Sequence, residues 1–349
     1  MKNREGKEGI IDINSCDADS FISDYVDSVS FTVLIENKAN LIGTIDKIIV
    51  FDGKTFIGDY RHKTITAFSA SGEPLYVIDK QGRGPGEYFH IQSFSVDSNH
   101  VYILDNYKEE IHLYSTVKGQ YEKSLKLPYY SDDFESLENG GFILAYAPDG
   151  ENDRRERGKR YRILVTDNKL RVTHCYLEYS ESDKDAIGFH RYLNTSGNSV
   201  VYASFDSDSY YVFSRKDGII KNTFSINNKS SLPLEQRSKI DFAISNTNFS
   251  YLNSVPFVCG DYVLFNYKDN SRIQEYLIIS KENKIVKNSN DDYNNSIVGV
   301  IGSDDHFFIC YWNKSIYNYM VENGFKRADN ITEAYINDDA TFLIKIYMK

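Results

Sequence analysis

The sequence is poor in several residue types that mark particular classes of protein. Its 349 residues include 1 Trp, 3 Met, 6 Pro and 4 Cys. No run approaches the roughly 20 consecutive apolar residues that a membrane-spanning helix needs. Acidic residues outnumber basic ones by 50 to 40, and this net charge of −10 is opposite to the basic surface that nucleic acids require. The composition therefore argues against a transmembrane segment and against a nucleic-acid partner.

The few cysteines also limit the metal chemistry that can be expected. No Cys-x-x-Cys pair occurs among the four cysteines, which are Cys16, Cys175, Cys259 and Cys310. Closed zinc sites, in contrast, usually have tightly spaced ligands. We predict buried thiols, with one disulfide as the alternative if the protein is exported. The polar opening Met1–Gly9 has no apolar signal core. A cytoplasmic protein and a mature exported protein both remain open.

Aromatic residues, in contrast, are abundant. The chain has 28 Tyr and 21 Phe, which suit pleated, half-buried strands and favour an all-β fold. A repeat supports this prediction, since Ile45–Phe68 aligns with Ile91–Tyr114 at an offset of 46 and places Asp59 on Asp105. Weaker copies are Val201–Phe213, Phe142–Tyr146 with Arg162–Thr166, Tyr262–Tyr267 with Ile273–Ile279, and His306–Trp312 with Thr341–Tyr347.

Each repeat contains alternating runs of four to seven residues bounded by Gly, Asn, Asp or Ser, which is typical of short strands. A period near 50 with four strands predicts a propeller blade. We therefore predict one domain over residues 1–349, a single six-bladed β-propeller of four-stranded antiparallel blades. The expected blades are roughly 45–80, 91–127, 132–178, 187–226, 250–288 and 295–349 plus 30–35, with 1–27 as an N-terminal extension.

Two further features of the propeller can be predicted from the chain ends and from the poorly matching segments. Ser30–Ile35 should complete the last blade beside Phe342–Tyr347, which would remove an exposed sheet edge. Leu232–Leu252 and Ser315–Asn337 have weak helical spacing and are expected to be excursions between strands.

The run Gly82–Tyr88 (GRGPGEY) follows the predicted strand Leu75–Asp79 and carries a family resemblance, together with Leu34–Ile48 and Asp339–Lys349. It resembles a bacterial family of six-bladed β-propellers related in pattern to NHL-repeat propellers. The resemblance implies an exported, periplasmic or cell-surface protein, commonly a lipoprotein tethered through an N-terminal cysteine. This chain departs from it at Cys16, which follows Ile-Asn-Ser rather than an apolar run. No catalytic residues are implied.

Candidate binding residues come from the predicted topology. In an antiparallel blade, the loop between the second and third strands and the connection to the next blade open on the same face, where loops carry function. Arg83 could reach an anionic or sugar ligand, or it could pair locally with Glu87 in a turn shaped by its glycines and Pro85. The candidates are Tyr60, Arg61, His62, Arg83, Glu87, Tyr88 and Tyr107.

Acidic residues suggest weaker candidates. Asp59 and Asp105 could coordinate a cation or accept sugar hydroxyls, but an Asp that caps its own turn is the alternative. Asp206 and Asp208 resemble a calcium loop without its remaining ligands. The charged insertion Asp149–Arg160 is expected to be a solvated loop. Its alternative role is partner docking through Arg154, Arg155 and Arg157.

These patterns leave two classes of function open. The first is a non-enzymatic binding or scaffold module for a glycan, peptide or protein partner, with no cofactor. The alternative is a metal-dependent hydrolase or lyase with a divalent cation at the channel mouth. Its candidate ligands are Glu36, Asp59, Asp105 and Asn266. The fold alone does not decide between these classes.

Overall fold

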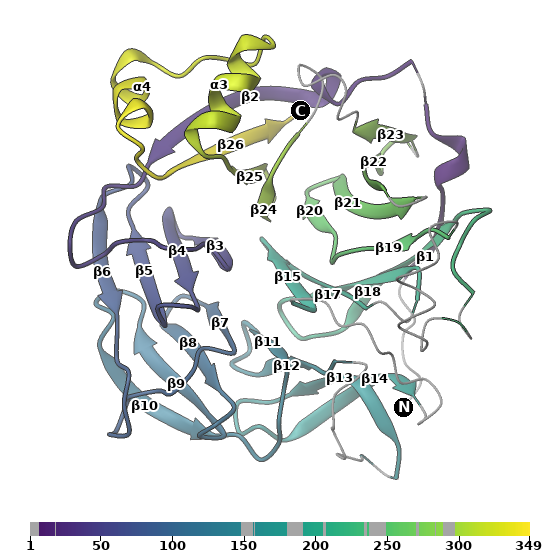
Figure 1. The fold of residues 1–349 in the computed structure, drawn as a ribbon. Helices are drawn as coiled ribbons and strands as arrows, with labels where there is room; N and C mark the ends of the chain where they lie inside the picture. The colour runs from purple at the N-terminus through teal and green to yellow at the C-terminus, as the bar shows by residue number, and fades with distance from the viewer. Residues whose placement is uncertain are drawn as a thin grey trace. The chain divides into compact units, whose positions relative to one another are not determined.

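The computed structural model places the chain in two compact units. The first comprises Met1–Asp19 and Pro128–Lys287, and the second Ser20–Leu127 and Asn288–Lys349. The structure describes residues 7–17, 19–147, 156, 158–179, 191–204, 207–233, 236, 249–269, 272–282, 284–288 and 297–349. Within this part of the chain, each unit contains three sheets, and their strands are antiparallel except for β1 (Figure 1). The predicted fold class, an all-β six-bladed propeller with four-stranded blades, is confirmed.

Blades 1 and 2, numbered in chain order, lie in the second unit and repeat each other at the predicted offset. β4 ends at Asp59 and β8 ends at Asp105. Phe56, Phe94 and Tyr114 are fully buried in one apolar cluster drawn from both blades. The strands of blade 1 are β3 (Lys47–Phe51), β4 (Lys54–Asp59), β5 (Thr64–Phe68) and β6 (Pro74–Ile78), and those of blade 2 are β7 (Ser93–Val96), β8 (His100–Asp105), β9 (Glu110–Ser115) and β10 (Tyr121–Lys126).

Blade 6, also in the second unit, joins both ends of the chain. Its strand order is β2-β26-β25-β24, and Val33 of β2 pairs with Phe342 of β26 (Figure 1). The predicted pairing of an N-terminal strand with the C-terminal strand is confirmed, although β2 begins and ends earlier than predicted. The elements are η2 (Ile22–Tyr25), β2 (Val26–Val33), β24 (Val300–Ser303), β25 (Phe307–Tyr311) and β26 (Phe342–Met348).

Two helices interrupt blade 6 where the sequence has helical spacing. α3 (Lys314–Glu322) and α4 (Asn330–Asn337) lie between β25 and β26 in the chain. The Asn313 and Asp329 side chains accept backbone N–H groups in the first turn of α3 and α4, respectively, which satisfies donors that a helix start leaves without a partner. The segment Ser315–Asn337 is thus an excursion between two strands, as predicted, and the structure shows that it is helical.

Blades 3, 4 and 5 make up the first unit. The inner edge of β21 pairs with two short strands, β19 and β20, on either side of Pro256, which has no N–H to give to a ladder. Blade 3 contains β11 (Asp133–Ser136), β12 (Phe142–Ala145), β13 (Arg160–Thr166) and β14 (Val172–Tyr179); blade 4 contains β15 (Leu193–Ser196), β16 (Ser199–Ala203), β17 (Ser209–Ser214) and β18 (Ile220–Asn227); blade 5 contains β19 (Tyr251–Leu252), β20 (Phe257–Cys259), β21 (Tyr262–Asp269), β22 (Arg272–Ile279) and β23 (Lys284–Asn288).

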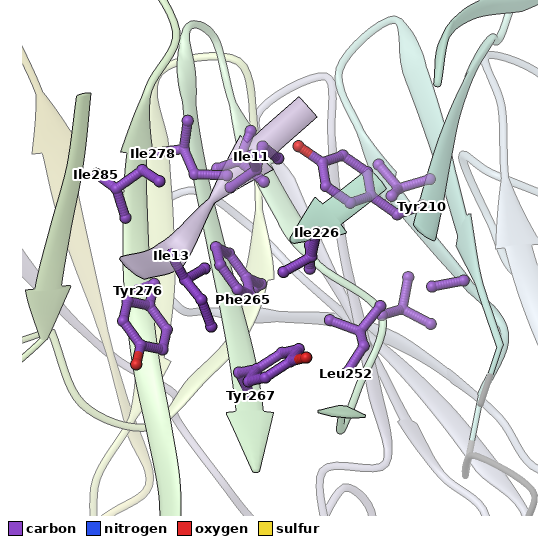
Figure 2. Packing of buried hydrophobic residues seen from close by; sticks show 14 of the residues in the cluster. Ile11, Ile13, Tyr210, Ile226, Leu252, Phe265, Tyr267, Tyr276, Ile278 and Ile285 are labelled. Atoms are coloured by element: carbon purple, nitrogen blue, oxygen red, sulfur yellow. The ribbon is translucent and has the colours of Figure 1, made fainter. Parts of the chain in front are cut away.

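The N-terminal segment was expected to lie outside the blades, yet it adds a fifth strand to blade 4. β1 (Lys7–Asp12) pairs in parallel with β18, followed by the short helix η1 (Ile13–Ser15). Gly9 lies against Phe224, where an added Cβ would be 2.8 Å from the ring. Ile11 and Ile13 are buried in an apolar cluster shared by blades 4 and 5 (Figure 2).

Some predictions fall on residues that the structure does not describe. Asp206, most of Leu232–Leu252 and most of Asp149–Arg160, including Arg154, Arg155 and Arg157, lie outside the described residues. Among the helices that are described, none is long and apolar enough to cross a membrane.

Candidate functional site

The predicted loop-bearing face is assembled in the second unit by three segments. These are the β4–β5 turn (60–63), the connection between blades 1 and 2 (79–90) and the β8–β9 turn (106–109), which together we term the connector face. The Gln81 side-chain amide donates to the His62 carbonyl at 3.0 Å, and Lys108 Nζ donates to the Glu87 carbonyl at 2.6 Å. The connection therefore bonds to both turns, so the three segments lie together as the topology predicts.

Asp59 is buried beneath the first turn and stabilises it. Its carboxylate accepts the N–H groups of Gly43, Thr44 and His62 at 2.8 to 3.0 Å, and His62 Nδ1 lies 2.8 Å from Oδ2. Burial opposes ionisation, but these hydrogen bonds outweigh it and lower the Asp59 pKa to about 2. The carboxylate thus connects the turn to the segment that precedes β3.

Asp105 does the same in blade 2. It is fully buried and accepts the N–H groups of Phe89 at 2.7 Å, Tyr107 at 3.0 Å and Lys108 at 3.3 Å. Both repeat-related acids therefore match the turn-capping alternative. These N–H groups engage carboxylate oxygens that a cation or sugar hydroxyl would otherwise contact.

Tyr88 corrects one of the predicted ligand contacts. Its side chain is fully buried among the residues of blades 1 and 2. The hydroxyl lies 2.8 Å from the Lys63 carbonyl oxygen and 3.0 Å from that of Ile78. Tyr88 is therefore a core residue that anchors the connection, and it presents no surface to a ligand.

The glycine-rich turn is not stabilised by the local Arg83–Glu87 pair that the sequence offered as an alternative. Glu87 Oε2 accepts the Gly84 N–H at 2.7 Å, so Glu87 stabilises the turn instead of pairing with Arg83. Gly82 and Gly86 have positive φ, whereas Gly84 does not. At Gly86 a Cβ would lie 2.3 Å from the Tyr121 ring, so only glycine fits there.

Arg83 and Tyr107 are the prominent exposed groups of the connector face. The Arg83 guanidinium carbon lies 5.9 Å from the centroid of the Phe89 ring, and no hydrogen bond or ion pair to another described residue occupies it. The Tyr107 side chain is 78% exposed and meets His90 edge to face at 5.9 Å. Arg61 and His62 are exposed on the neighbouring turn, while Tyr60 and Glu87 are half-buried.

Sequence reasoning missed two members of this surface, Phe89 and Lys108. Phe89 is 38% exposed, and Lys108 Nζ lies 5.6 Å from its ring centroid. Phe89 directly follows the buried Tyr88, and neighbouring residues of an extended segment point in opposite directions, so its exposure could have been inferred once Tyr88 was placed in the core. Lys108 acts through tertiary contacts for which the sequence contains no local signal.

The alternative metal site is divided between the two units. Glu36, Asp59 and Asp105 belong to the second unit and Asn266 to the first, so this grouping stays a prediction. Glu36 Oε2 accepts the Ile42 N–H at 2.8 Å. Across the described residues, no cluster of three or more His, Cys, Asp or Glu side chains could hold a metal ion. None of the four cysteines forms a disulfide; Cys259 and Cys310 are buried as predicted, whereas Cys16 and Cys175 are half-buried.

A family comparison places the chain in a known group. The family described as a domain of unknown function, DUF4934, matches residues 8–338. The chain belongs to this family. Among curated protein sequences, none matches it. The predicted relation to NHL-repeat propellers stays a prediction.

Two solved structures resemble this DUF4934 chain along nearly its whole length. A Bacteroides fragilis protein designated a candidate exported protein shares 16% identity, with a TM-score of 0.72, 98% of this chain covered and 100% of that chain. A member of the DUF4221 family from Bacteroides vulgatus shares 12% identity, with a TM-score of 0.54, 93% of this chain covered and 97% of that chain. At these identities, the similarity of this DUF4934 member to both structures establishes the fold alone.

Proposed function

We propose that this DUF4934 protein is a non-enzymatic binding or scaffold module whose connector face recognises a glycan, peptide or protein partner. The observation that supports the proposal is that the acidic and the basic residues of that face differ in their contacts. The acids Asp59, Asp105 and Glu87 accept hydrogen bonds that hold the loops, whereas Arg61 and Arg83 extend outward. Exposed arginine and tyrosine on a rigid support are the residue types that dominate recognition surfaces.

A thermal-shift screen tests this proposal. The panel contains glycans, peptides and divalent cations, and a ligand at one hundred times its dissociation constant should add about 2.7 kcal/mol to the stability of the folded state. The double variant Arg61→Ala/Arg83→Ala should abolish the ligand-induced shift without lowering the unliganded melting temperature. Lys118→Ala, an exposed lysine in the β9–β10 turn at the opposite end of blade 2, is the matched control.

The screen also has outcomes that count against the proposal. A glycan or peptide that binds the double variant as tightly as the native chain would place recognition elsewhere. A melting temperature raised by calcium, magnesium or zinc, together with turnover of a substrate, would favour the metal-dependent hydrolase or lyase.

We also propose that the protein is exported, to the periplasm or the cell surface. The support is the family resemblance and the designation of the similar Bacteroides fragilis protein. Cell fractionation with an antibody against this chain should detect it outside the cytoplasm, and its confinement to the cytoplasm would contradict the proposal. The lipoprotein tether implied by the resemblance stays a prediction, which metabolic labelling with a fatty acid would test.

A further inference from the structure

Several main-chain groups of the connector face are already hydrogen-bonded within the protein. The Gly82 N–H donates to the Tyr88 carbonyl, and the Glu87 N–H donates to the Gly84 carbonyl, both at 3.1 Å. Lys108 Nζ donates to the Gly84 and Glu87 carbonyls at 3.2 and 2.6 Å, and the Tyr114 hydroxyl donates to the Gly86 carbonyl. An extended peptide that binds by main-chain pairing would have to compete with these internal bonds at Gly82, Gly84, Gly86 and Glu87.

Exposed side chains of the connector face offer a ligand a charged group and aromatic rings. Arg83 carries five N–H donors in a planar fork, which matches the two oxygens of a carboxylate. It is exposed, and it lies over the Phe89 ring. Tyr107 adds a second exposed aromatic ring next to His90. The face therefore combines a carboxylate-binding group beside one exposed ring, Phe89, with a second exposed ring, Tyr107, on the adjacent β8–β9 turn.

The local charge also favours an anion. Arg83 and Lys108 both lie within 6 Å of the Phe89 centroid. The nearest acids are engaged, because Asp105 accepts three N–H groups beneath the surface and Glu87 accepts the Gly84 N–H. Asp105 and Glu87 keep their negative charge while they accept these bonds, but Arg83 is the exposed charge beside the Phe89 ring. This exposed cation favours an anionic ligand even on a chain whose net charge is −10.

We propose that Arg83, Phe89 and Tyr107 form a subsite for an acidic sugar, in which Arg83 binds the carboxylate of a uronic acid while an aromatic ring packs against the C–H groups of the pyranose. This inference rests on the proposed function and names its ligand class. A uronic acid combines one planar carboxylate with an apolar ring face and needs no main-chain pairing, which matches what this surface provides.

Calorimetric titration of the intact protein tests the subsite. The probes are polygalacturonate, alginate and hyaluronan, each compared with its carboxyl-reduced neutral form, and poly-L-glutamate serves as an acidic peptide. At least one acidic glycan should bind, and its carboxyl-reduced form should bind about tenfold more weakly or worse, because a charge-assisted bidentate contact is lost. Binding should also weaken as salt increases.

Two variants with matched controls locate the contact. Arg83→Gln should weaken acidic-glycan binding at least about tenfold, and Tyr107→Ala should weaken it by several-fold. Lys118→Gln and Val117→Ala, exposed residues at the opposite end of the same blade, should bind within about twofold of the native chain, because surface changes away from a site have small effects. Unchanged melting temperatures would show that every variant folds.

Some results would contradict the acidic-sugar subsite alone, and others would also contradict the proposed function. Equal binding of poly-L-glutamate would show that charge alone is recognised, and unchanged binding by Arg83→Gln would remove the carboxylate contact. If no acidic glycan binds but a neutral glycan or a peptide does, and the Arg61→Ala/Arg83→Ala variant loses it, the proposed function stands and the acidic-sugar subsite fails. If ligands bind without any effect of either set of variants, both fail.

Discussion

At the scale of single residues, buried carboxylates of the connector face join separate segments of the backbone. Asp59 joins the β4–β5 turn to the segment before β3 through three backbone N–H groups. Asp105 joins the corresponding turn of blade 2 to Phe89. In both repeats, therefore, an Asp carboxylate joins the turn to a preceding segment of the chain. The exposed residues around this carboxylate differ between the two blades.

Asp59→Asn should lower the free energy of unfolding at pH 7 by about 2 kcal/mol, the equivalent of its pKa shift from 3.8 to about 2. Because the folded-state pKa is depressed, this contribution is present above pH 4 and is lost as the pH falls from about 4 to about 2. Urea unfolding of the native chain and the variant at pH 7 and pH 3 measures it.

The control for Asp59 is Asp52→Asn, an exposed hairpin residue whose substitution should leave stability unchanged at both pH values. A difference between Asp59→Asn and the native chain that does not shrink at low pH would mean that ionisation is not the source of the effect.

Tyr88→Phe should destabilise the protein by about 1–2 kcal/mol, since the Lys63 and Ile78 carbonyls lose a buried hydroxyl partner. Ligand affinity should stay the same, because Tyr88 is fully buried. Chemical unfolding and calorimetric titration of the same sample separate the two effects. A loss of ligand affinity without a change in stability would mean that Tyr88 contacts the ligand after all.

At the scale of elements, β1 shows what the sequence pattern does not reveal. The segment is short and polar at its start, and its partner β18 begins more than 200 residues later. A parallel pairing of this kind depends on tertiary packing, for which no local turn signal exists. The antiparallel hairpins of blades 1 and 2 were predictable because alternation and turn residues fix them locally.

Ile11→Ala should lower the free energy of unfolding by about 2–4 kcal/mol, because the removed atoms leave a cavity in the cluster of blades 4 and 5 (Figure 2). Ile10→Ala is the matched control in the same strand, since Ile10 is 77% exposed and should cost little. Denaturant midpoints of the two variants give the comparison, and equal losses would contradict the burial of β1.

At the scale of the whole molecule, polar side chains of inner strands bond to adjacent blades. Asp133 of blade 3 accepts the N–H groups of Tyr192 and Leu193 before and within β15, at 3.0 and 2.9 Å. The Asn194 amide of blade 4 donates to the Val255 carbonyl of blade 5 at 3.0 Å. In blades 1 and 2, Lys47 Nζ donates to Ser93 Oγ at 3.1 Å. Apolar packing between blades is thus supplemented by directional contacts.

Asp133→Ala should destabilise the protein by about 2–4 kcal/mol, because two buried N–H groups lose a charged acceptor. The exposed neighbour Glu138 provides the control Glu138→Ala, which should be nearly neutral. Amide hydrogen exchange should show faster exchange at Tyr192 and Leu193 in the first variant only. Protection that persists there would mean that other acceptors replace the carboxylate.

The sequence was sufficient for the number of blades, for the pairing of β2 with β26 and for the grouping of loops on the connector face. It was insufficient for Tyr88 and Phe89, adjacent aromatics in a connection without periodic spacing. Only the contact of the Tyr88 hydroxyl with Lys63 and Ile78 shows which of the two points inward. Lys108 was missed because its carbonyl partners belong to another loop.

The pairing of β2 with β26 also sets an order of events during synthesis. Val26–Val33 is synthesised more than 300 residues before its partner Phe342–Met348. β1 likewise waits for β18. Contacts of such high sequence separation form slowly, so a growing chain holds β1 unpaired until β18 has been made and β2 unpaired until β26 has been made. During this delay the chain remains accessible to chaperones and to any machinery that accepts only unfolded polypeptide.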